Sequence, residues 1–321
     1  MHTIRYAANA AADDRGMIHS DEYAGRGGDP RDLIDMARTR LLVRVRRGSY
    51  CLRSTWEAAS VEERHLLRLH AVLRTVGTEY LAAGPSAAIL WGLPLLDPPD
   101  ETVTLLGPFR GGGRSDPGVR RITRAYARAR AVQHGGFRVT DPPRTAADLT
   151  VDQGFVAGVM AFDALLRLRL ADRSAIEGLR DSSGFRSGRR LVARAAAFAR
   201  AEAESPGESA ARAAIRLAGF EVPELQVEFP ADGKVDRVDF FWRGADVAGE
   251  FDGRVKYTRQ EFTGGRPEEV VWREKLREDR LRRSVESVLR ITWRDVRDPQ
   301  RLVRLLRSHG IPDRGPAVVS A

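Results

Sequence analysis

The chain holds 321 residues, of which 42% are hydrophobic and 30% are charged, and its net charge is +9. Because a single hydrophobic core stops growing at about 250–300 residues, this length predicts two or three domains. No stretch approaches the roughly 20 consecutive apolar residues of a membrane helix, and no apolar leader with a small-residue cleavage site begins the chain, so we expect a cytoplasmic protein without a membrane partner.

The cysteine and histidine content limits the metal and redox chemistry. Cys51 is the only cysteine, which excludes an internal disulfide framework and any zinc site made mainly of thiolates. The six histidines are scattered without metal-ligand spacing, so we interpret each as a surface or helix residue. No G-x-x-x-x-G-K-[ST] motif occurs, and no helix start follows the glycine run at 111–113, which argues against an ATPase or a Rossmann dehydrogenase.

The excess of positive charge lies in the first two thirds of the chain. Residues 1–201 carry 31 arginines and 22 acidic residues, whereas residues 202–321 carry 22 basic and 22 acidic residues. A basic module attracts nucleic acid phosphates, so we expect a nucleic acid partner, with DNA preferred over RNA. Arginine outnumbers lysine by 50 to 3, so Lys234, Lys256 and Lys275 stand out as departures from that composition.

The first 55 residues have the pattern of helices followed by a β-hairpin. Residues 4–12 are rich in alanine, residues 20–23 start a short helix, and Asp29-Pro30 is a cap that leads into a helix over 32–39. Residues 42–46 then alternate apolar and basic side chains before a turn at Arg47-Gly48 and a second strand. This outline predicts a winged helix-turn-helix over residues 1–55.

In such a domain the recognition helix and the wing contact DNA. Arg44 and Arg46 would share one strand face and reach phosphates, while two acidic residues on the helix weaken its attraction to DNA. The alternative is that the hairpin only closes a small core. The residues that we expect to bind DNA are Arg31, Arg38, Arg44, Arg46 and Arg47.

Three segments carry a family resemblance. The sequences LVRVRRGSYCL, SAAILWGLPLL at 86–96 and VTDPPRTAADL at 139–149 resemble AbiEi-type antitoxin winged-helix proteins of actinobacteria. The resemblance implies a DNA-binding domain over 1–55, a mainly helical middle domain over 56–203, and a toxin as a partner; whether the chain forms a homo-oligomer stays open. From the residues alone, we expect a helix that ends at Gly92 and a turn into a further helix at 142–145.

From residue 204 onward the pattern is α-β-β-β-α-β. Ser205-Pro206-Gly207-Glu208 has the form of a helix start, with serine as the cap, proline at the first position and glutamate at the third. Alternating strands and turns follow. The predicted elements are a helix over 206–217, strands over 225–229, 235–242 and 247–252, a charged helix over 267–285, a strand over 287–293 and a helix over 299–308.

Carboxylates interrupt two of these apolar strands. Alternation puts Glu250 and Asp252 on one face of their strand, and hairpin pairing brings Asp239 next to them. Clustered carboxylates repel one another and need a compensating cation, and oxygen-only ligands suit Mg²⁺ or Mn²⁺. Such an ion catalyses phosphodiester hydrolysis, with Lys256 or Lys275 helping to neutralise developing charge.

The segments SPGES, RVDFFW, GEFDGRVKY, EKLREDRLR and VLRITWRDV resemble the PD-(D/E)XK nuclease superfamily, most closely its very-short-patch-repair-like branch, domain of unknown function 559. The resemblance implies a restriction-endonuclease-like domain over 204–321, with Asp239 and Glu250 as metal ligands and Glu208 as the acid of the first helix. This chain has E-x-D where the superfamily often has E-x-K, so Asp252 stands at the position of the usual lysine.

These features predict an α+β multidomain protein that binds DNA and hydrolyses its phosphodiester bonds with Mg²⁺ or Mn²⁺. Each acidic residue also has a structural interpretation: Glu208 can be the helix cap, Asp239 can pair with Arg237, and Asp252 can belong to an Asp-Gly turn. The rival function is a transcriptional regulator or antitoxin-like protein whose nuclease fold is inactive. An RNA-binding role is a third alternative, because phosphate chemistry does not separate the two polymers.

Overall fold

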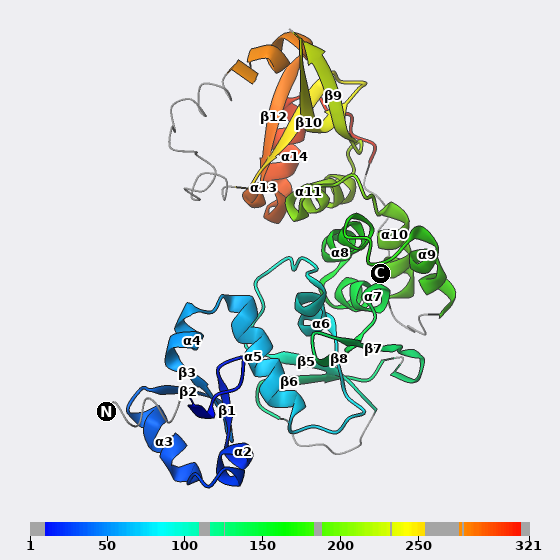
Figure 1. Cartoon of the computed structure of the whole chain (residues 1–321). Helices are drawn as coiled ribbons and strands as arrows, with labels where there is room; N and C mark the ends of the chain where they lie inside the picture. Colours follow the sequence, from blue (N-terminus) through cyan, green and yellow to red (C-terminus); the bar gives the residue numbers. More distant parts are fainter. Residues whose placement is uncertain are drawn as a thin grey trace. The chain divides into compact units, whose positions relative to one another are not determined.

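A computed structural model describes residues 10–108, 116–124, 126–182, 188–231, 233–253, 276–277 and 279–315 (Figure 1). The chain divides into two compact units, which we call unit 1 (residues 1–148 and 181–185) and unit 2 (residues 149–180 and 186–321). The three-part division at residues 55 and 203 stays a prediction. Within the described ranges, no helix is long and apolar enough to cross a membrane.

Unit 1 begins with a three-stranded sheet of order β1-β3-β2 and two short helices. The short helix from residue 20, the helix after Asp29-Pro30 and the hairpin form as predicted, whereas β1, which pairs antiparallel with β3, was not predicted. The alanine-rich helical segment expected over 4–12 lies mostly outside the described residues. In α3 the apolar side chains of Leu33 and Met36 are buried, and Asp29 caps the helix by accepting the N–H of Arg31. The elements are β1 (Met17–His19), α2 (Ser20–Gly25), α3 (Pro30–Arg38), β2 (Leu42–Arg46) and β3 (Ser49–Leu52).

The rest of unit 1 contains a five-stranded mixed sheet of order β6-β5-β4-β8-β7. Helices make up more of the predicted middle region, 56–203, than strands do, as expected, but the sequence did not predict this sheet. The elements are α4 (Arg53–Ala58), α5 (Val61–Leu73), β4 (Leu81–Ala82), α6 (Gly84–Trp91), β5 (Val103–Leu106), β6 (Val119–Ile122), the 3-10 turn η1 (Tyr126–Arg128), β7 (Ala131–His134) and β8 (Phe137–Thr140).

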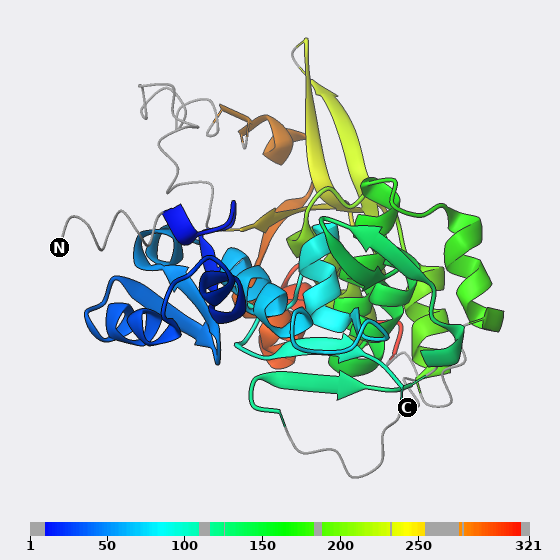
Figure 2. The same cartoon turned by 60° about the horizontal axis from the view of Figure 1, so that its bottom comes forward.

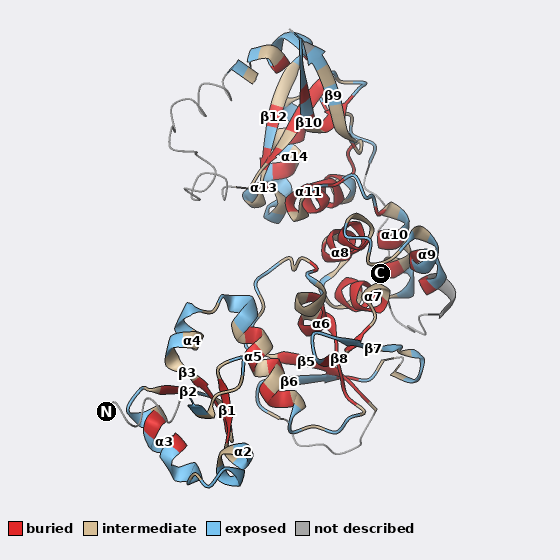
Figure 3. Ribbon diagram, in the orientation of Figure 1, coloured by how far each residue is buried: buried red, intermediate tan, exposed pale blue. Residues whose placement is uncertain are grey.

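The helix α7 (Pro142–Gln153) begins in unit 1 and ends in unit 2, where a group of helices surrounds α8. Figure 3 shows that α8 and α11 are buried along most of their length. Small alanine side chains allow these helices to pack closely. The helices are α8 (Phe155–Arg167), α9 (Arg173–Ser182), α10 (Arg189–Phe198) and α11 (Pro206–Leu217).

A buried ion pair joins α8 to α11. Nη2 of Arg212 donates to both carboxylate oxygens of Asp163 at 2.8 and 3.0 Å. The backbone N–H of Arg200 donates to the same carboxylate at 2.7 Å, and the Arg212 guanidinium stacks on the Phe198 ring at 4.1 Å. The side chain of Asp163 is 0% exposed and that of Arg212 is 2% exposed. The two opposite charges therefore neutralise each other in the interior of the unit.

The last part of unit 2 is a four-stranded sheet of order β12-β11-β10-β9, antiparallel except for the parallel pair of β11 and β12. Figure 2 shows β9 and β10 extending together as a long hairpin. The elements form where the sequence predicts them, apart from the additional α13. They are β9 (Glu224–Ala231), β10 (Lys234–Trp242), β11 (Val247–Asp252), β12 (Ser287–Thr292), α13 (Trp293–Arg297) and α14 (Pro299–Ser308).

Two layers of apolar side chains cover this sheet. On one face, Phe240, Trp242 and Phe251 pack with α11 and α14. On the other face, Val238 and Phe241 pack with residues of a helical segment over 279–284. The predicted charged helix over 267–285 is described only in its last part, since residues 254–275 lie outside the described ranges.

Candidate functional site

The strands β10 and β11 separate at Asp239. Their ladder pairs Trp242 with Val247 and ends at Phe240 and Gly249, so the next position along the register would put Asp239 opposite Glu250. There the Asp239 carboxylate replaces the backbone ladder: its Oδ2 accepts the N–H of Phe251 at 2.8 Å. Asp239 therefore lies at a fork between two strands, which we call the strand fork.

The strand alternation also changes at this level. In a regular strand Val238 and Phe240 would share one face, but Val238 packs in the layer of Phe241 while Phe240 packs in the opposite layer. Gln226, which the register of β9 places opposite Asp239, has a left-handed backbone with φ of 53°. Such a conformation is costly outside glycine and is found disproportionately at functional sites.

The N-terminus of α11 lies against the strand fork. Ser205 caps the helix, as predicted, and its Oγ accepts the N–H of Glu208 at 3.2 Å. A Cβ on Gly207 would lie 2.0 Å from the Phe251 ring, so only glycine lets the helix approach β11 this closely. The close approach brings the next residue, Glu208, to the fork.

Glu208 is buried and is held by two donors. Its Oε2 accepts the N–H of Glu204 at 2.9 Å and Nε2 of Gln226 at 2.8 Å. Burial raises the pKa of Glu208, and the nearby negative charge of Asp239 raises it further. The Glu208 side chain bonds to the residue before the cap rather than to the cap itself, so the predicted capping role is only part of its environment.

Glu250 and Asp252 lie on β11 with half-buried side chains, and alternation puts both on the sheet face opposite Phe251. Nη2 of Arg277 lies 2.7 Å from Oε1 of Glu250 and donates to the carbonyl oxygen of Arg237 at 2.7 Å. Arg277 thus places a positive charge against Glu250. The lysine that stands out nearby in the sequence is Lys275.

The geometry brings together some of the predicted site residues and separates others. Glu208, Asp239 and Gln226 meet on the α11 side of the fork, whereas Glu250 meets Arg277 on the other side. These carboxylates do not form a group of three with oxygens within 4.8 Å of one another in the described part of the chain. Lys256 and Lys275 lie outside the described residues.

Of the five arginines expected to bind DNA, three are exposed and carry no ion pair among the described residues: Arg31, Arg44 and Arg47. Arg38 is exposed and pairs with Asp35 at 3.1 Å. Arg46 pairs with Asp116 at 2.6 Å, and a β-bulge between Arg44 and Arg46 interrupts the alternation that would put both on one face.

A second group of side chains, which the sequence did not predict, lies in unit 1. Asp13, His19 and His70 each place a potential ligand atom within 4.8 Å of the others. Fifty residues separate the two histidines along the chain, so no spacing rule identifies them. The expectation that each histidine is a surface or helix residue is corrected for His19, which is 2% exposed and lies on a strand.

No protein-family model matches the chain, and no curated protein matches it by sequence. Among solved structures, the chain is similar to the crystal structure of the RV2827C protein from Mycobacterium tuberculosis, with a TM-score of 0.41 and 18% identity. The match covers 71% of this chain and 88% of that one.

Proposed function

We propose that the protein binds DNA through the first part of unit 1 and that the strand fork of unit 2 is a Mg²⁺-dependent nuclease-type site for phosphodiester hydrolysis. The observation that carries the proposal is the meeting of Glu208, Asp239 and Gln226 where β10 and β11 separate, with Glu250 next in register. The helix-sheet order α11, β9, β10, β11, β12 is the order that the resemblance to PD-(D/E)XK nucleases implies.

The charge of the fork supports a cation ligand. Glu208 and Asp239 are neighbouring carboxylates, and the pKa of Glu208 is raised because burial and Asp239 both disfavour its ionised form. A divalent cation would offset this repulsion, and hard oxygen donors suit Mg²⁺ or Mn²⁺. Asp239 and Glu250 would hold the ion, with Asp252 at the end of β11 as a further ligand.

When bound, such an ion supplies polarisation of the phosphoryl group and a more acidic water molecule. The protein's own residues have distinct roles. Glu208, which Gln226 orients, holds negative charge beside Asp239, and Asp239 keeps the strands at a fixed separation through its bond to Phe251 N–H. Arg277 provides the positive charge that the E-x-D sequence lacks at the usual lysine position.

The first part of unit 1 supports a DNA partner. The order β1, α2, α3, β2, β3 matches the order of elements in a winged helix-turn-helix, with α3 in the place of the recognition helix. Arg31 and Arg38 are exposed on α3, where a spacing of seven residues puts them on the same side of the helix. Arg44 and Arg47 are exposed on the hairpin. Such side chains contact phosphates and set the protein's position on the duplex.

The test is a cleavage assay on duplex, nicked and single-stranded DNA with Mg²⁺ or Mn²⁺. We expect Asp239→Asn and Glu250→Gln to lower the cleavage rate by at least ~100-fold, because each removes a charged metal ligand. Glu224→Gln is the matched control, since Glu224 is an exposed acid of the same sheet that pairs with Arg243. Absence of cleavage in all conditions, or equal cleavage by all three variants, would refute hydrolysis.

Two observations favour a second function, a transcriptional regulator or antitoxin-like protein with an inactive fold. Arg277 already neutralises Glu250, and the fork residues divide between the two sides of β11. This alternative predicts that the chain binds a specific duplex and that Arg44→Ala with Arg47→Ala weakens binding at least ~10-fold. Asp239→Asn would leave the dissociation constant unchanged, and so would the surface control Arg243→Ala.

A further inference from the structure

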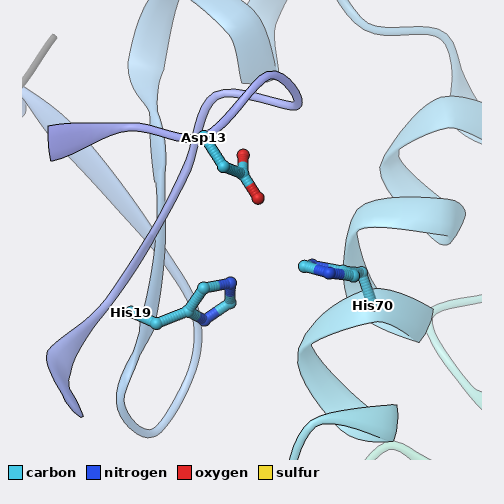
Figure 4. Close-up of side chains that lie close together, drawn as sticks. All are labelled: Asp13, His19 and His70. Atoms are coloured by element: carbon cyan, nitrogen blue, oxygen red, sulfur yellow. The ribbon is translucent and has the colours of Figure 1, made fainter. Parts of the chain in front are cut away.

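Three side chains converge in unit 1, and none of them belongs to the strand fork or to the arginines expected to bind DNA. Asp13 precedes β1, His19 ends β1, and His70 lies on α5. Figure 4 shows the carboxylate and the two imidazole rings pointing toward a common centre. The ring centroids of His19 and His70 lie 5.3 Å apart, and one ligand atom from each of the three residues lies within 4.8 Å of the others.

Both histidines keep a buried nitrogen without a hydrogen-bond partner among the described residues. These atoms are Nε2 of His19, a residue that is 2% exposed, and Nδ1 of His70. An unpaired polar atom in the interior destabilises the fold, so these nitrogens indicate a ligand. His65 shows the usual arrangement, because its Nε2 bonds Ser86 Oγ at 2.8 Å and its Nδ1 lies 3.2 Å from the Asp100 carbonyl oxygen.

The environment of His19 prepares one nitrogen for a ligand. Its Nδ1 lies 3.0 Å from Oγ of Ser49 on β3, so an Nδ1–H donor to that hydroxyl leaves the lone pair of Nε2 facing the centre. Metal-binding histidines have this arrangement, in which a hydrogen bond on one nitrogen fixes the ring and its tautomer. The ring of His70 is held at its edge by Phe137, at a centroid distance of 6.2 Å.

Asp13 supplies negative charge at the same centre. Its Oδ1 accepts the N–H groups of Arg15 and Met17 at 2.9 and 2.8 Å, which fixes the carboxylate, and no described residue donates to Oδ2. Two arginines lie nearby but are engaged elsewhere. Arg74 pairs with Asp21 and Glu22 at 2.9 and 2.6 Å, and the Arg15 guanidinium lies over the Phe137 ring at 5.6 Å.

We propose that Asp13, His19 and His70 form a binding site for a divalent transition metal of the Zn²⁺ class. Two imidazoles and one carboxylate are a ligand set for Zn²⁺, Co²⁺, Ni²⁺ or Fe²⁺, and imidazole disfavours Mg²⁺ and Ca²⁺. Zinc bonds of about 2.0–2.2 Å put tetrahedral ligands roughly 3.4 Å apart, so small side-chain rotations complete the site. Three protein ligands leave a fourth position for water or a small ligand.

A metal at this site would stabilise the first part of unit 1. Asp13 and His19 belong to the segment around β1, which pairs with β3, and His70 belongs to α5. Their common ligand would therefore connect the three-stranded sheet to the helix that follows it. Because the metal binds the folded arrangement and not the unfolded chain, it would raise stability, and the gain would grow with the logarithm of its concentration above the dissociation constant.

The experiment titrates Co²⁺ and Zn²⁺ into the full chain after chelation and removal of any polyhistidine tag. We expect one Co²⁺ per chain with visible absorption bands of low-symmetry coordination, displacement by Zn²⁺, and no effect of Mg²⁺. His70→Gln and Asp13→Asn should each weaken binding at least ~10-fold. The control His134→Gln should bind normally, since His134 stacks on Trp91 outside the cluster.

Thermal unfolding provides the second measurement, because His70→Gln can also affect folding. At 100 times the dissociation constant, Zn²⁺ should stabilise the wild type by about 2.7 kcal/mol and stabilise folded His70→Gln much less. The proposal is overturned if no stoichiometric Co²⁺ or Zn²⁺ binding occurs. Equal binding by the wild type, His70→Gln and Asp13→Asn would also overturn it.

Discussion

The two units differ in the kind of polar group that each leaves unneutralised. Unit 2 pairs its buried acids with arginine at Asp163 and Asp236, yet keeps two carboxylates side by side at Glu208 and Asp239. Unit 1 pairs Asp148 with two arginines but keeps imidazole nitrogens without partners beside Asp13. Excess negative charge among oxygen donors suits Mg²⁺, whereas imidazole nitrogen suits Zn²⁺, and the cations that we propose for the two units differ for this reason.

The comparison also separates structural charge from functional charge. A buried ion pair that is fully hydrogen-bonded contributes to the fold, and removing one partner leaves an uncompensated charge. Two like charges near each other, or buried nitrogens without a hydrogen-bond partner, destabilise the fold, and we propose that a ligand compensates for them here. Removing one charge of a buried ion pair should therefore lower the stability of the fold, whereas removing one of two neighbouring like charges should raise it.

The largest effect on stability is expected for Asp163→Asn. The change leaves the Arg212 charge buried between α8 and α11 without its counter-ion, which should lower the free energy of unfolding by about 3–5 kcal/mol. Urea denaturation followed by circular dichroism measures it. The matched control is Glu224→Gln, which removes an exposed acid and should leave the midpoint unchanged; a similar loss in both variants would contradict the distinction between buried and exposed pairs.

A smaller, pH-dependent effect is expected for Asp236→Asn. Two hydrogen bonds from Arg280, each 2.7 Å long, hold the pKa of Asp236 below the ordinary 3.8 of a free aspartate. Because the folded pKa is lowered, its contribution is present above pH 3.8 and is lost as the pH falls through the folded value. The variant should lose about 1–2 kcal/mol at neutral pH, and the two proteins should converge in acid.

Urea denaturation across the pH range below neutral checks this prediction. A difference between wild type and variant that stays constant down to pH 2 would mean that the Asp236 charge does not contribute. In that case the pairing of acids with arginine in unit 2 would not stabilise the fold. The stability of these acids could then not be contrasted with that of the carboxylates at the strand fork.

Local pattern was enough to predict the sheet of unit 2. Alternating apolar residues predict β9, β10 and β11, and the register of β10 with β11 places Asp239 one step beyond the end of the ladder, opposite Glu250. Such information is carried by neighbouring residues and by the period of two. The left-handed backbone of Gln226 interrupts the period of two. The alternation of β9 therefore could not predict which residues lie on the α11 side of the strand fork.

Other features depend on contacts between distant segments. Gly207 is understood only once Phe251 is seen against it, and Arg277 is distinguished from the many arginines of its segment only by its bonds to Glu250 and the Arg237 carbonyl. The strands β4 to β8 hold two to four residues each, too few to show periodicity. The meeting of His19 with His70 likewise required the tertiary fold.

The smallest effect, and one of opposite sign, is expected for Glu208→Gln in a buffer that contains a chelator. The change removes the charge beside Asp239 while an amide oxygen can still accept from Glu204 N–H and Gln226. The folded pKa of Glu208 is raised, so the wild type is at full stability below pH 4.5 and loses stability as the pH rises through the folded value. The variant should therefore be more stable than the wild type at neutral pH, by about 0.5–1 kcal/mol, and equal to it in acid.

Denaturation at neutral and acid pH, repeated with Mn²⁺, tests this sign. Mn²⁺ should stabilise the wild type more than the variant, because only the wild type has the full negative charge that the ion offsets. If Glu208→Gln instead lowers stability at neutral pH, the negative charge of Glu208 stabilises the N-terminus of α11. Glu208 would then lie near Asp239 because of packing. The carboxylates of the strand fork, like the acids that pair with arginine, would have a structural role.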